Sequence, residues 1–111
     1  MSRHYILLPA KLPSGTAAIV CGYDRHPAEH YFLNICASMS DDDLAEPLWA
    51  SILVEEYSVA TVIDSFDGML ANYGIVLPEA YKDALREEWN TKPMRRVVHW
   101  NSDGTIDHEE A

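Results

Sequence analysis

The sequence is poor in positive charge. Eight Lys and Arg residues stand against eighteen Asp and Glu residues, so the formal net charge is −10. This deficit disfavours direct binding to a nucleic-acid backbone, which requires clustered cations that displace counterions. Residues 38–60 contain no Lys or Arg, and their acidic side chains are Asp41, Asp42, Asp43, Glu46, Glu55 and Glu56. A basic protein surface is the partner that such a segment attracts.

Cysteine and long apolar runs are also scarce. Two cysteines, Cys21 and Cys36, are too few for a disulfide framework. No apolar run approaches the roughly 20 residues of a membrane-spanning helix, and residues 5–8 are too few for the core of a signal peptide. We therefore expect a soluble cytoplasmic protein that folds as one domain over residues 1–111.

Motifs for nucleotide binding and for serine hydrolysis are missing. The five glycines form no glycine-rich phosphate loop, and Ser14 is not in the Gly-x-Ser-x-Gly pattern of a nucleophile elbow. Cys21 or Cys36 could act as a nucleophile beside an imidazole, but their apolar neighbours predict buried, neutral thiols. The sequence therefore predicts no cofactor and no catalytic residue, and it favours a non-enzymatic function.

A hairpin over residues 17–37 organises the rest of the chain. β-Branched and aromatic side chains flank a polar elbow around Pro27, which favours a turn. Pairing Cys21 opposite Leu33 places both side chains on one face of the hairpin. The same face then carries Ile19, Tyr23, Tyr31 and Ile35. Cys36 falls on the other face, which argues against a disulfide bond.

Further strands are predicted at residues 3–8, 48–54 and 95–100. The middle segment alternates as a strand does, but its apolar residues also approximate a helical stripe. We favour a strand that ends near Glu55. Residues 107–111 are expected to form a flexible, frayed acidic tail.

Two helices follow from the apolar periodicity. Apolar residues at three- and four-residue spacing predict a helix over residues 59–73, capped by Ser58 and closed by Gly74. A second helix should begin at Pro78 and end within residues 90–93. The order of elements predicts an α+β fold, with a mainly antiparallel β-sheet of about four or five strands and two α-helices packed on one face.

Candidate binding residues lie in the elbow and in the acidic segment after it. They are Asp24, Arg25, His26, His30, Asp41, Asp42, Asp43, Glu46 and Trp49. Because no complete catalytic constellation occurs among them, we predict a small acidic interaction or regulatory module with a basic protein partner. A homodimer is also open if an edge of the sheet stays unpaired.

A metal-binding protein or metal-dependent hydrolase is the first alternative. Cys21, Asp24, His26 and His30 offer the ligand types that zinc uses, although the short paired spacing of a structural zinc site is missing.

An acidic inhibitor that imitates DNA is the second alternative. Glu79, Asp83 and Glu87 share a helical face at four-residue spacing, but Lys82 and Arg86 are interleaved with them. The predicted face therefore has mixed charge, unlike a row of phosphates.

Overall fold

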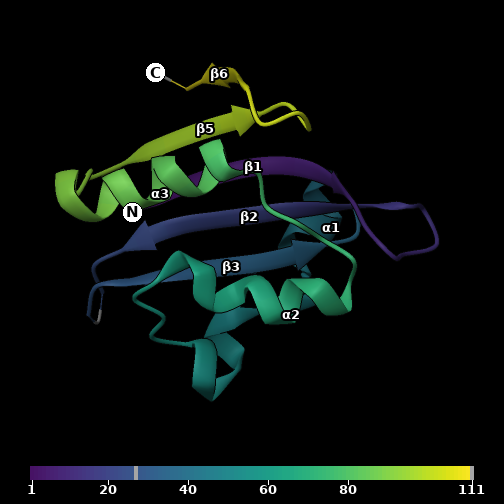
Figure 1. The fold of residues 1–111 in the computed structure, drawn as a ribbon, viewed down its shortest axis with the longest axis horizontal. Coiled ribbons are helices and arrows are strands. Elements are labelled where there is room, and N and C mark those ends of the chain that lie inside the picture. Colours follow the sequence, from purple (N-terminus) through teal and green to yellow (C-terminus); the bar gives the residue numbers. More distant parts are fainter. Residues whose placement is uncertain (27, 111) are drawn as a thin grey trace.

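The computed structural model describes residues 1–26 and 28–110, and it is built on a single mixed sheet of six strands (Figure 1). The strand order is β4-β3-β2-β1-β5-β6; β1 and β5 run parallel, and the other neighbours are antiparallel. Pro27, in the predicted elbow, lies outside the described residues. The strands are β1 (Ser2–Pro9), β2 (Thr16–Asp24), β3 (His30–Cys36), β4 (Trp49–Ala50), β5 (Arg96–Trp100) and β6 (Ile106–Glu109).

The helices lie on both sides of this sheet. The main ones, α2 and α3, pack on one face, and the short α1 lies behind the sheet in the view of Figure 1. Their bounds are α1 (Asp41–Ala45), α2 (Asp67–Asn72) and α3 (Glu79–Thr91), and the 3₁₀ turns are η1 (Ser51–Leu53), η2 (Glu55–Tyr57) and η3 (Ile63–Phe66). The predicted α+β class and mainly antiparallel sheet are therefore confirmed, with six strands in place of four or five.

The predicted register of the hairpin is also confirmed. Cys21 pairs with Leu33, and Tyr23 with Tyr31, in the β2–β3 ladder. Cys21 belongs to the core between the sheet and the helices. Cys36 pairs with Ala18, and both lie at positions whose side chains alternate to the opposite face from Cys21. Both thiols are free and buried. Strand alternation therefore separates the two cysteines, as their sequence positions predict.

Helix α3 directly precedes β5, the strand that pairs in parallel with β1. Pro78 is its N-cap residue, and Lys92 ends it in a left-handed conformation with φ 49°. Tyr81 and Leu85, four residues apart on one side, are fully buried against the sheet. The Tyr81 hydroxyl donates to the His4 carbonyl at 2.8 Å, which ties the helix to β1.

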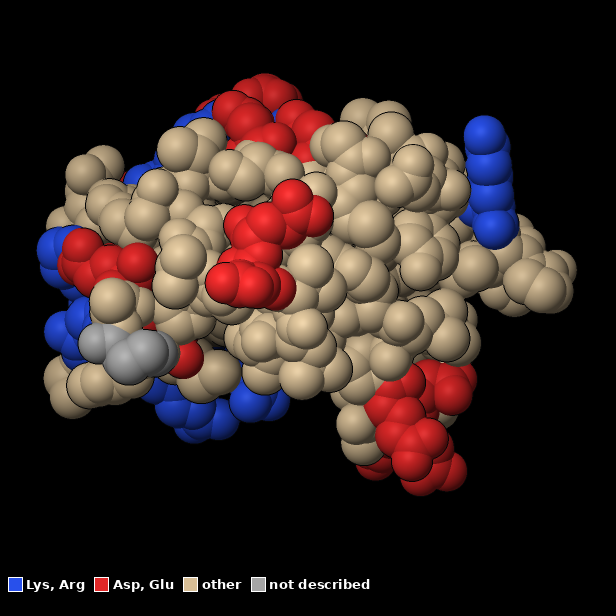
Figure 2. All heavy atoms as spheres, turned by 90° about the horizontal axis from the view of Figure 1, so that it is seen from below, with Lys and Arg blue, Asp and Glu red and all other residues tan. Residues whose placement is uncertain are grey.

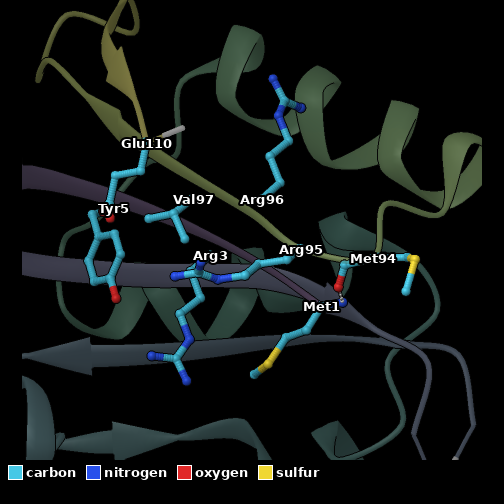
Figure 3. Close-up of a pocket in the computed structure, with 8 residues that line it drawn as sticks. All are labelled: Met1, Arg3, Tyr5, Met94, Arg95, Arg96, Val97 and Glu110. Carbon is cyan, nitrogen blue, oxygen red and sulfur yellow. Dashed lines mark hydrogen bonds between the residues drawn. The ribbon is translucent and has the colours of Figure 1, made fainter.

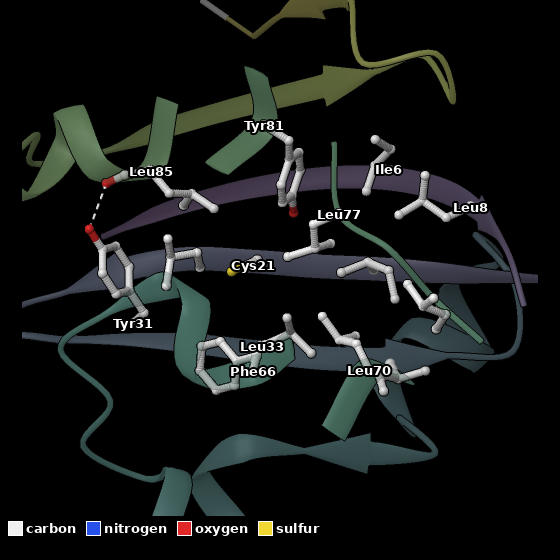
Figure 4. Close-up of a cluster of buried hydrophobic side chains, with 14 of the residues drawn as sticks. Ile6, Leu8, Cys21, Tyr31, Leu33, Phe66, Leu70, Leu77, Tyr81 and Leu85 are labelled. Atoms are coloured by element: carbon white, nitrogen blue, oxygen red, sulfur yellow. Dashed lines mark hydrogen bonds between the residues drawn. The ribbon is translucent and has the colours of Figure 1, made fainter. Parts of the chain in front are cut away.

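The core fills the space between α2, α3 and the sheet, as Figure 4 shows. Its largest fully buried side chains include Tyr23, Tyr81, Phe66, Ile6, Ile19 and Leu33. The Tyr31 hydroxyl reaches the edge of this cluster and donates to the Leu85 carbonyl at 3.0 Å. Aromatic side chains thus contribute buried area while their polar groups stay hydrogen-bonded.

The predicted helix over residues 59–73 begins later than expected. Ala60 forms a bridge with Tyr31, whose amide donates to the Ala60 carbonyl at 2.7 Å, and Val62 is extended. The helical conformation starts at Ile63 as η3 and continues as α2. Gly74 follows in the left-handed region with φ +69°, as predicted. The expected Ser58 cap is wrong, because Ser58 closes the turn η2.

The predicted strand over residues 48–54 is reduced to the two residues of β4. The hydroxyl of Ser51 accepts the Leu33 amide at 2.9 Å, so a side chain takes the place of the next ladder bond. The backbone then turns through η1 and η2. A local side-chain hydrogen bond has ended the strand.

Part of the expected frayed tail belongs to a strand. Residues 106–109 form β6, which pairs with β5 through Val98 and His99. The amide of Glu110 donates to the Val97 carbonyl at 2.9 Å, so the pairing extends beyond the strand itself. Ala111 lies outside the described residues. Among the described helices, none combines the length and the apolar character needed to span a bilayer.

Candidate functional site

The face of the sheet opposite α2 and α3, here called the second face, carries a groove. Alternation along β1 turns Ser2 toward α3, whereas Arg3 and Tyr5 line hollows on the second face. Part of this face is covered by α1 and η1, whose Leu44 and Ile52 line one of the hollows. Three adjoining hollows remain, and Tyr5 lines all three. We call them together the second-face groove.

A column of three stacked rings crosses the groove. Tyr5, His99 and His108 are register partners on β1, β5 and β6. The Tyr5 and His99 rings lie 5.0 Å apart at an angle of 10°, and those of His99 and His108 lie 4.4 Å apart at 11°. The carboxylate of Glu110 is 2.7 Å from Nε2 of His99, and this hydrogen bond lowers the pKa of Glu110. Direct cross-strand pairing thus fixes the position of the Tyr5 ring.

The first hollow has a volume of about 450 Å³ and a cationic wall (Figure 3). Its lining residues are Met1, Arg3, Tyr5, Met94, Arg95, Arg96, Val97 and Glu110. Figure 3 shows the side chains of Arg3 and Arg95 extending into the space between Tyr5 and Met1. The wall therefore combines guanidinium groups with aromatic and apolar surface.

The three arginines of this hollow differ in their pairing. Arg96 contacts Glu88 at 3.2 Å and Glu109 at 3.0 Å, and the hydrogen bond to Glu109 raises the pKa of Arg96 above its usual value. Arg3 and Arg95 are exposed and have no salt bridge within the described part of the chain. Their charges are therefore the ones available to a ligand.

The second hollow, of about 330 Å³, lies on the other side of Arg3 and contains His30, Asp24 and Asn34. The His30 ring is buried, and its Nδ1 lies 2.7 Å from the carbonyl of Ala28. A carbonyl can only accept, so Nδ1 carries the proton and donates it. In the neutral ring Nε2 is then an acceptor, and it has no hydrogen-bond partner among the described residues.

The third hollow, of about 420 Å³, brings the acidic helix α1 to the groove. Asp41 and Leu44 line it together with Tyr5, His99 and His108. The groove therefore has a cationic part around Arg3 and an acidic border at α1. This juxtaposition joins three separate segments of the chain, around Tyr5, Asp41 and His99.

The structure places the predicted elbow residues in two different environments. Asp24 and His30 lie in the groove, whereas Arg25 and His26 are exposed at the tip of the hairpin. The amide of His26 donates to Oδ1 of Asp24 at 3.2 Å, an arrangement typical of an Asx turn. The tip is therefore an ordinary polar turn at one end of the groove.

The elbow is tied to the end of α3. Glu29 accepts a hydrogen bond from the Tyr23 hydroxyl at 2.8 Å and also pairs with Lys92. The ammonium of Lys92 and the hydroxyl of Tyr23 together lower the pKa of Glu29. This contact joins the hairpin to the end of the helix.

The predicted acidic residues occupy α1. Asp41, Asp42 and Glu46 are exposed, and Asp43 is half-buried because it accepts the Ser38 hydroxyl at 2.6 Å. Trp49 lies elsewhere, half-buried, with its ring packed edge-on against Tyr57 at 5.4 Å and Phe66 at 6.4 Å. Its position is therefore that of a packing residue between β4 and the helices.

The residues of the metal-site alternative do not come together. Cys21 is fully buried on the core face, where burial raises the pKa of its thiol, whereas Asp24 and His30 line a hollow on the second face. Burial also raises the pKa of Cys36. Within residues 1–26 and 28–110, no three His, Cys, Asp or Glu side chains are arranged to hold a metal ion.

The acidic face of α3 is largely neutralised by its own cations. Lys82 bridges Asp64 at 2.9 Å and Asp67 at 2.7 Å, and Arg86 bridges Glu79 and Asp83, both at 2.7 Å. The hydrogen bonds that Arg86 donates to Glu79 and Asp83 raise the pKa of its guanidinium. Figure 2 shows acidic side chains in separate clusters on the face seen from below. No row of unpaired carboxylates resembling a DNA strand is formed by this helix.

A buried polar network lies on the helix side of β1. Glu88 of α3 accepts from the Ser2 hydroxyl at 2.5 Å and from Nε2 of His4 at 3.0 Å. The Trp100 indole donates to Nδ1 of His4 at 3.0 Å, so the His4 proton is on Nε2. Ser2 and His4 have no exposed surface, and both contact Glu88 instead of each other. The arrangement is a structural clamp, because a substrate could not reach it.

Sequence reasoning missed the centre of the groove. Arg3 and Tyr5 were assigned only to a strand, and Arg95, His99 and His108 were given no site role. The available signal was the alternation of Arg3, Tyr5 and Leu7 with Ser2, His4, Ile6 and Leu8, which marks two faces of β1. Nothing in the sequence shows that β5 pairs in parallel beside β1.

No protein-family model, curated protein or solved structure matches this chain. The chemistry of the groove and of the acidic helix is therefore the basis for a functional proposal.

Proposed function

We propose that the protein is a non-enzymatic interaction module that binds a basic protein partner through α1 and the turns η1 and η2. We call this region the α1–η2 surface. Its exposed members are Asp41, Asp42, Glu46, Leu48, Ile52, Leu53, Glu55 and Glu56. The observation that carries the proposal is the presence of unpaired carboxylates beside strongly exposed apolar side chains.

The carboxylates of this surface have no cationic partner inside the described chain. None of Asp41, Asp42, Glu46, Glu55 or Glu56 forms a salt bridge with another described residue. The carboxylates near α3, by contrast, are paired with Lys82 and Arg86. An unpaired acidic surface attracts a basic partner and speeds its association.

Apolar side chains on the same surface supply contact area. Leu53 is 81% exposed, Ile52 is 62% exposed and Leu48 is 52% exposed. Clustered exposed apolar residues bordered by charge are typical of protein interaction sites. A partner segment that presents Lys or Arg beside an apolar side chain would match both features.

The carboxylates of α1 are held in place by local structure. Ser40 is the N-cap residue, and its hydroxyl accepts the Asp43 amide at 3.2 Å. Asp41, Asp42 and Asp43 stand in the first turn, where negative charge is favoured by the helix dipole. The array is therefore preorganised, which lowers the entropic cost of binding.

Quantitative capture with purified bait tests this proposal. The charge variant D41N/D42N/E46Q and the apolar variant L53S should each retain about tenfold less of a basic partner than wild type. The matched control E79Q/D83N/E87Q makes the same change in charge on α3. Its capture should stay near that of wild type, because exposed ion pairs contribute little to stability.

Binding of the recovered partner is then measured with purified components at several salt concentrations. Affinity should fall as salt rises, because screening weakens the attraction between exposed charges. Equal capture by wild type and D41N/D42N/E46Q would contradict the proposal. A loss confined to E79Q/D83N/E87Q would point to α3 and would contradict it as well.

A further inference from the structure

We propose that the first and second hollows of the second-face groove form a binding site for a small organic anion beside the α1–η2 surface. A phosphate or carboxylate group pairs with Arg3 and Arg95, and an apolar or planar body packs against Tyr5 and Val97. The site has opposite charge to the α1–η2 surface. It therefore selects a different ligand, and the two sites share Ile52, which lines the second hollow.

Two guanidinium groups supply the anion contact. Arg3 and Arg95 line the same hollow, and neither has a carboxylate within salt-bridge distance among the described residues. Arg86 and Arg96 each pair with at least two carboxylates. A guanidinium presents a planar fork of donors that matches phosphate and carboxylate oxygens. Of the three arginines without a salt bridge among the described residues, Arg3 and Arg95 thus line one cavity, and Arg25 lies at the hairpin tip.

The walls beside these arginines fit a body that is not charged. Tyr5, Val97, Met1 and Met94 line the first hollow with Arg3. The ring of Tyr5 stacks on that of His99, which supports this wall. A volume of about 450 Å³ is within the range of small-molecule sites, which are mostly apolar with a few placed polar groups.

Arg3 connects this space to the second hollow. That hollow adds His30, whose Nε2 has no described partner, and Asn34, with Val20 and Phe32 as apolar walls. A ligand that extends past Arg3 therefore meets hydrogen-bonding groups next to apolar surface. The two hollows on either side of one arginine favour an elongated ligand over a bare ion.

Carboxylates at the ends of the groove limit what binds. Asp24 lines the second hollow, and Glu110 lines the first, where it is already hydrogen-bonded to His99 at 2.7 Å. Asp41 and Asp107 line the adjoining third hollow, and the acids outside the groove act over longer distances. At physiological salt the Debye length is about 8 Å, so their repulsion is largely screened. The two nearby arginines then determine the sign of the local interaction.

Titration with phenyl phosphate, followed by NMR, tests the assignment. Wild type should show saturable shifts at Arg3, Tyr5 and Val97 in the low-millimolar range. R3A and R95A should each weaken binding about tenfold or more, since each removes charge-assisted hydrogen bonds. The control R25A removes an exposed arginine at the hairpin tip and should change affinity less than about twofold.

Four results would overturn the proposal. One is the lack of saturable shifts in wild type, and another is equal weakening by R25A and R3A while thermal melting confirms that all variants are folded. Equal affinity for inorganic phosphate and phenyl phosphate would contradict the role of the apolar walls. Sedimentation at the NMR concentration tests whether a second copy of the protein occupies the groove. Self-association that R3A abolishes would assign the groove to the acidic segment of a second copy and would overturn the small-ligand assignment.

Discussion

Replacing Glu88 by alanine is expected to be among the most destabilising single changes in this protein. Its side chain is 1% exposed and accepts hydrogen bonds from Ser2, His4 and Arg96 at 2.5, 3.0 and 3.2 Å. Burial alone would raise the pKa of Glu88, but the hydrogen bonds from His4 and Ser2 and the charge of Arg96 lower it. The carboxylate is therefore the ionised centre of the clamp between α3 and β1.

The magnitude follows from what the substitution leaves behind. E88A removes the charged acceptor of three donors and leaves the buried groups of Ser2 and His4 unpaired, and each hydrogen bond to a charged group contributes about 1.5–3 kcal/mol. A domain of this kind has a total free energy of unfolding of about 5–15 kcal/mol. E88Q keeps the volume and one acceptor oxygen, so the loss should be about 1.5–3 kcal/mol, the range of a hydrogen bond to a charged group.

Urea unfolding followed by circular dichroism measures these differences. The control E87Q changes an exposed neighbour on the same helix and should stay within about 0.5 kcal/mol of wild type. Because the folded pKa of Glu88 is lowered, its contribution is complete above about pH 4.5 and is lost as the pH falls through the lowered value. A cost of E88Q equal to that of E87Q at neutral pH would refute the argument.

Three further results are expected from local structure. Cys21 should not react with a thiol reagent in the native protein at pH 8, since burial raises the pKa of its thiol; rapid native labelling would contradict this. G22A should destabilise strongly, because a Cβ there would lie 1.9 Å from the Ser2 carbonyl oxygen, whereas G68A, with open space around it, should stabilise α2 by about 0.5–1 kcal/mol. Equal melting temperatures for the two would refute this contrast. The Glu110 amide should be protected from hydrogen exchange, which a frayed tail would not allow.

The hairpin could be predicted from the sequence because one face of it is buried. A slip of one residue would move the core side chains of one strand, such as Leu33 of β3, to the second face, so hydrophobic alternation specifies the register. Helix α3 was equally readable, since Tyr81 and Leu85 repeat at helical spacing after Pro78. Patterns of buried apolar residues therefore gave reliable predictions.

Segments stabilised by polar contacts were not readable in this way. Strand β6 is exposed at every residue and pairs through His99 with His108 and through Arg96 with Glu109. No hydrophobic periodicity marks such a strand. The early end of β4 depends in the same way on one hydroxyl, that of Ser51. The groove was missed for two reasons. Its centre lies on a polar face of the sheet, and it depends on the parallel pairing of two segments that are distant in the sequence.

Strand β1 links the stability of the core to the geometry of the groove. Ser2 points to Glu88 on the helix side, and Arg3, the next residue, points into the groove on the second face. Because adjacent residues of a strand point to opposite faces, a shift of the backbone at Ser2 also shifts Arg3. E88Q, which should remain folded, is therefore expected to weaken phenyl phosphate binding by loosening the start of β1, although Glu88 itself lies across the sheet from the ligand. Unchanged affinity in E88Q would show that Arg3 is held by the ladder with β2 and β5 alone.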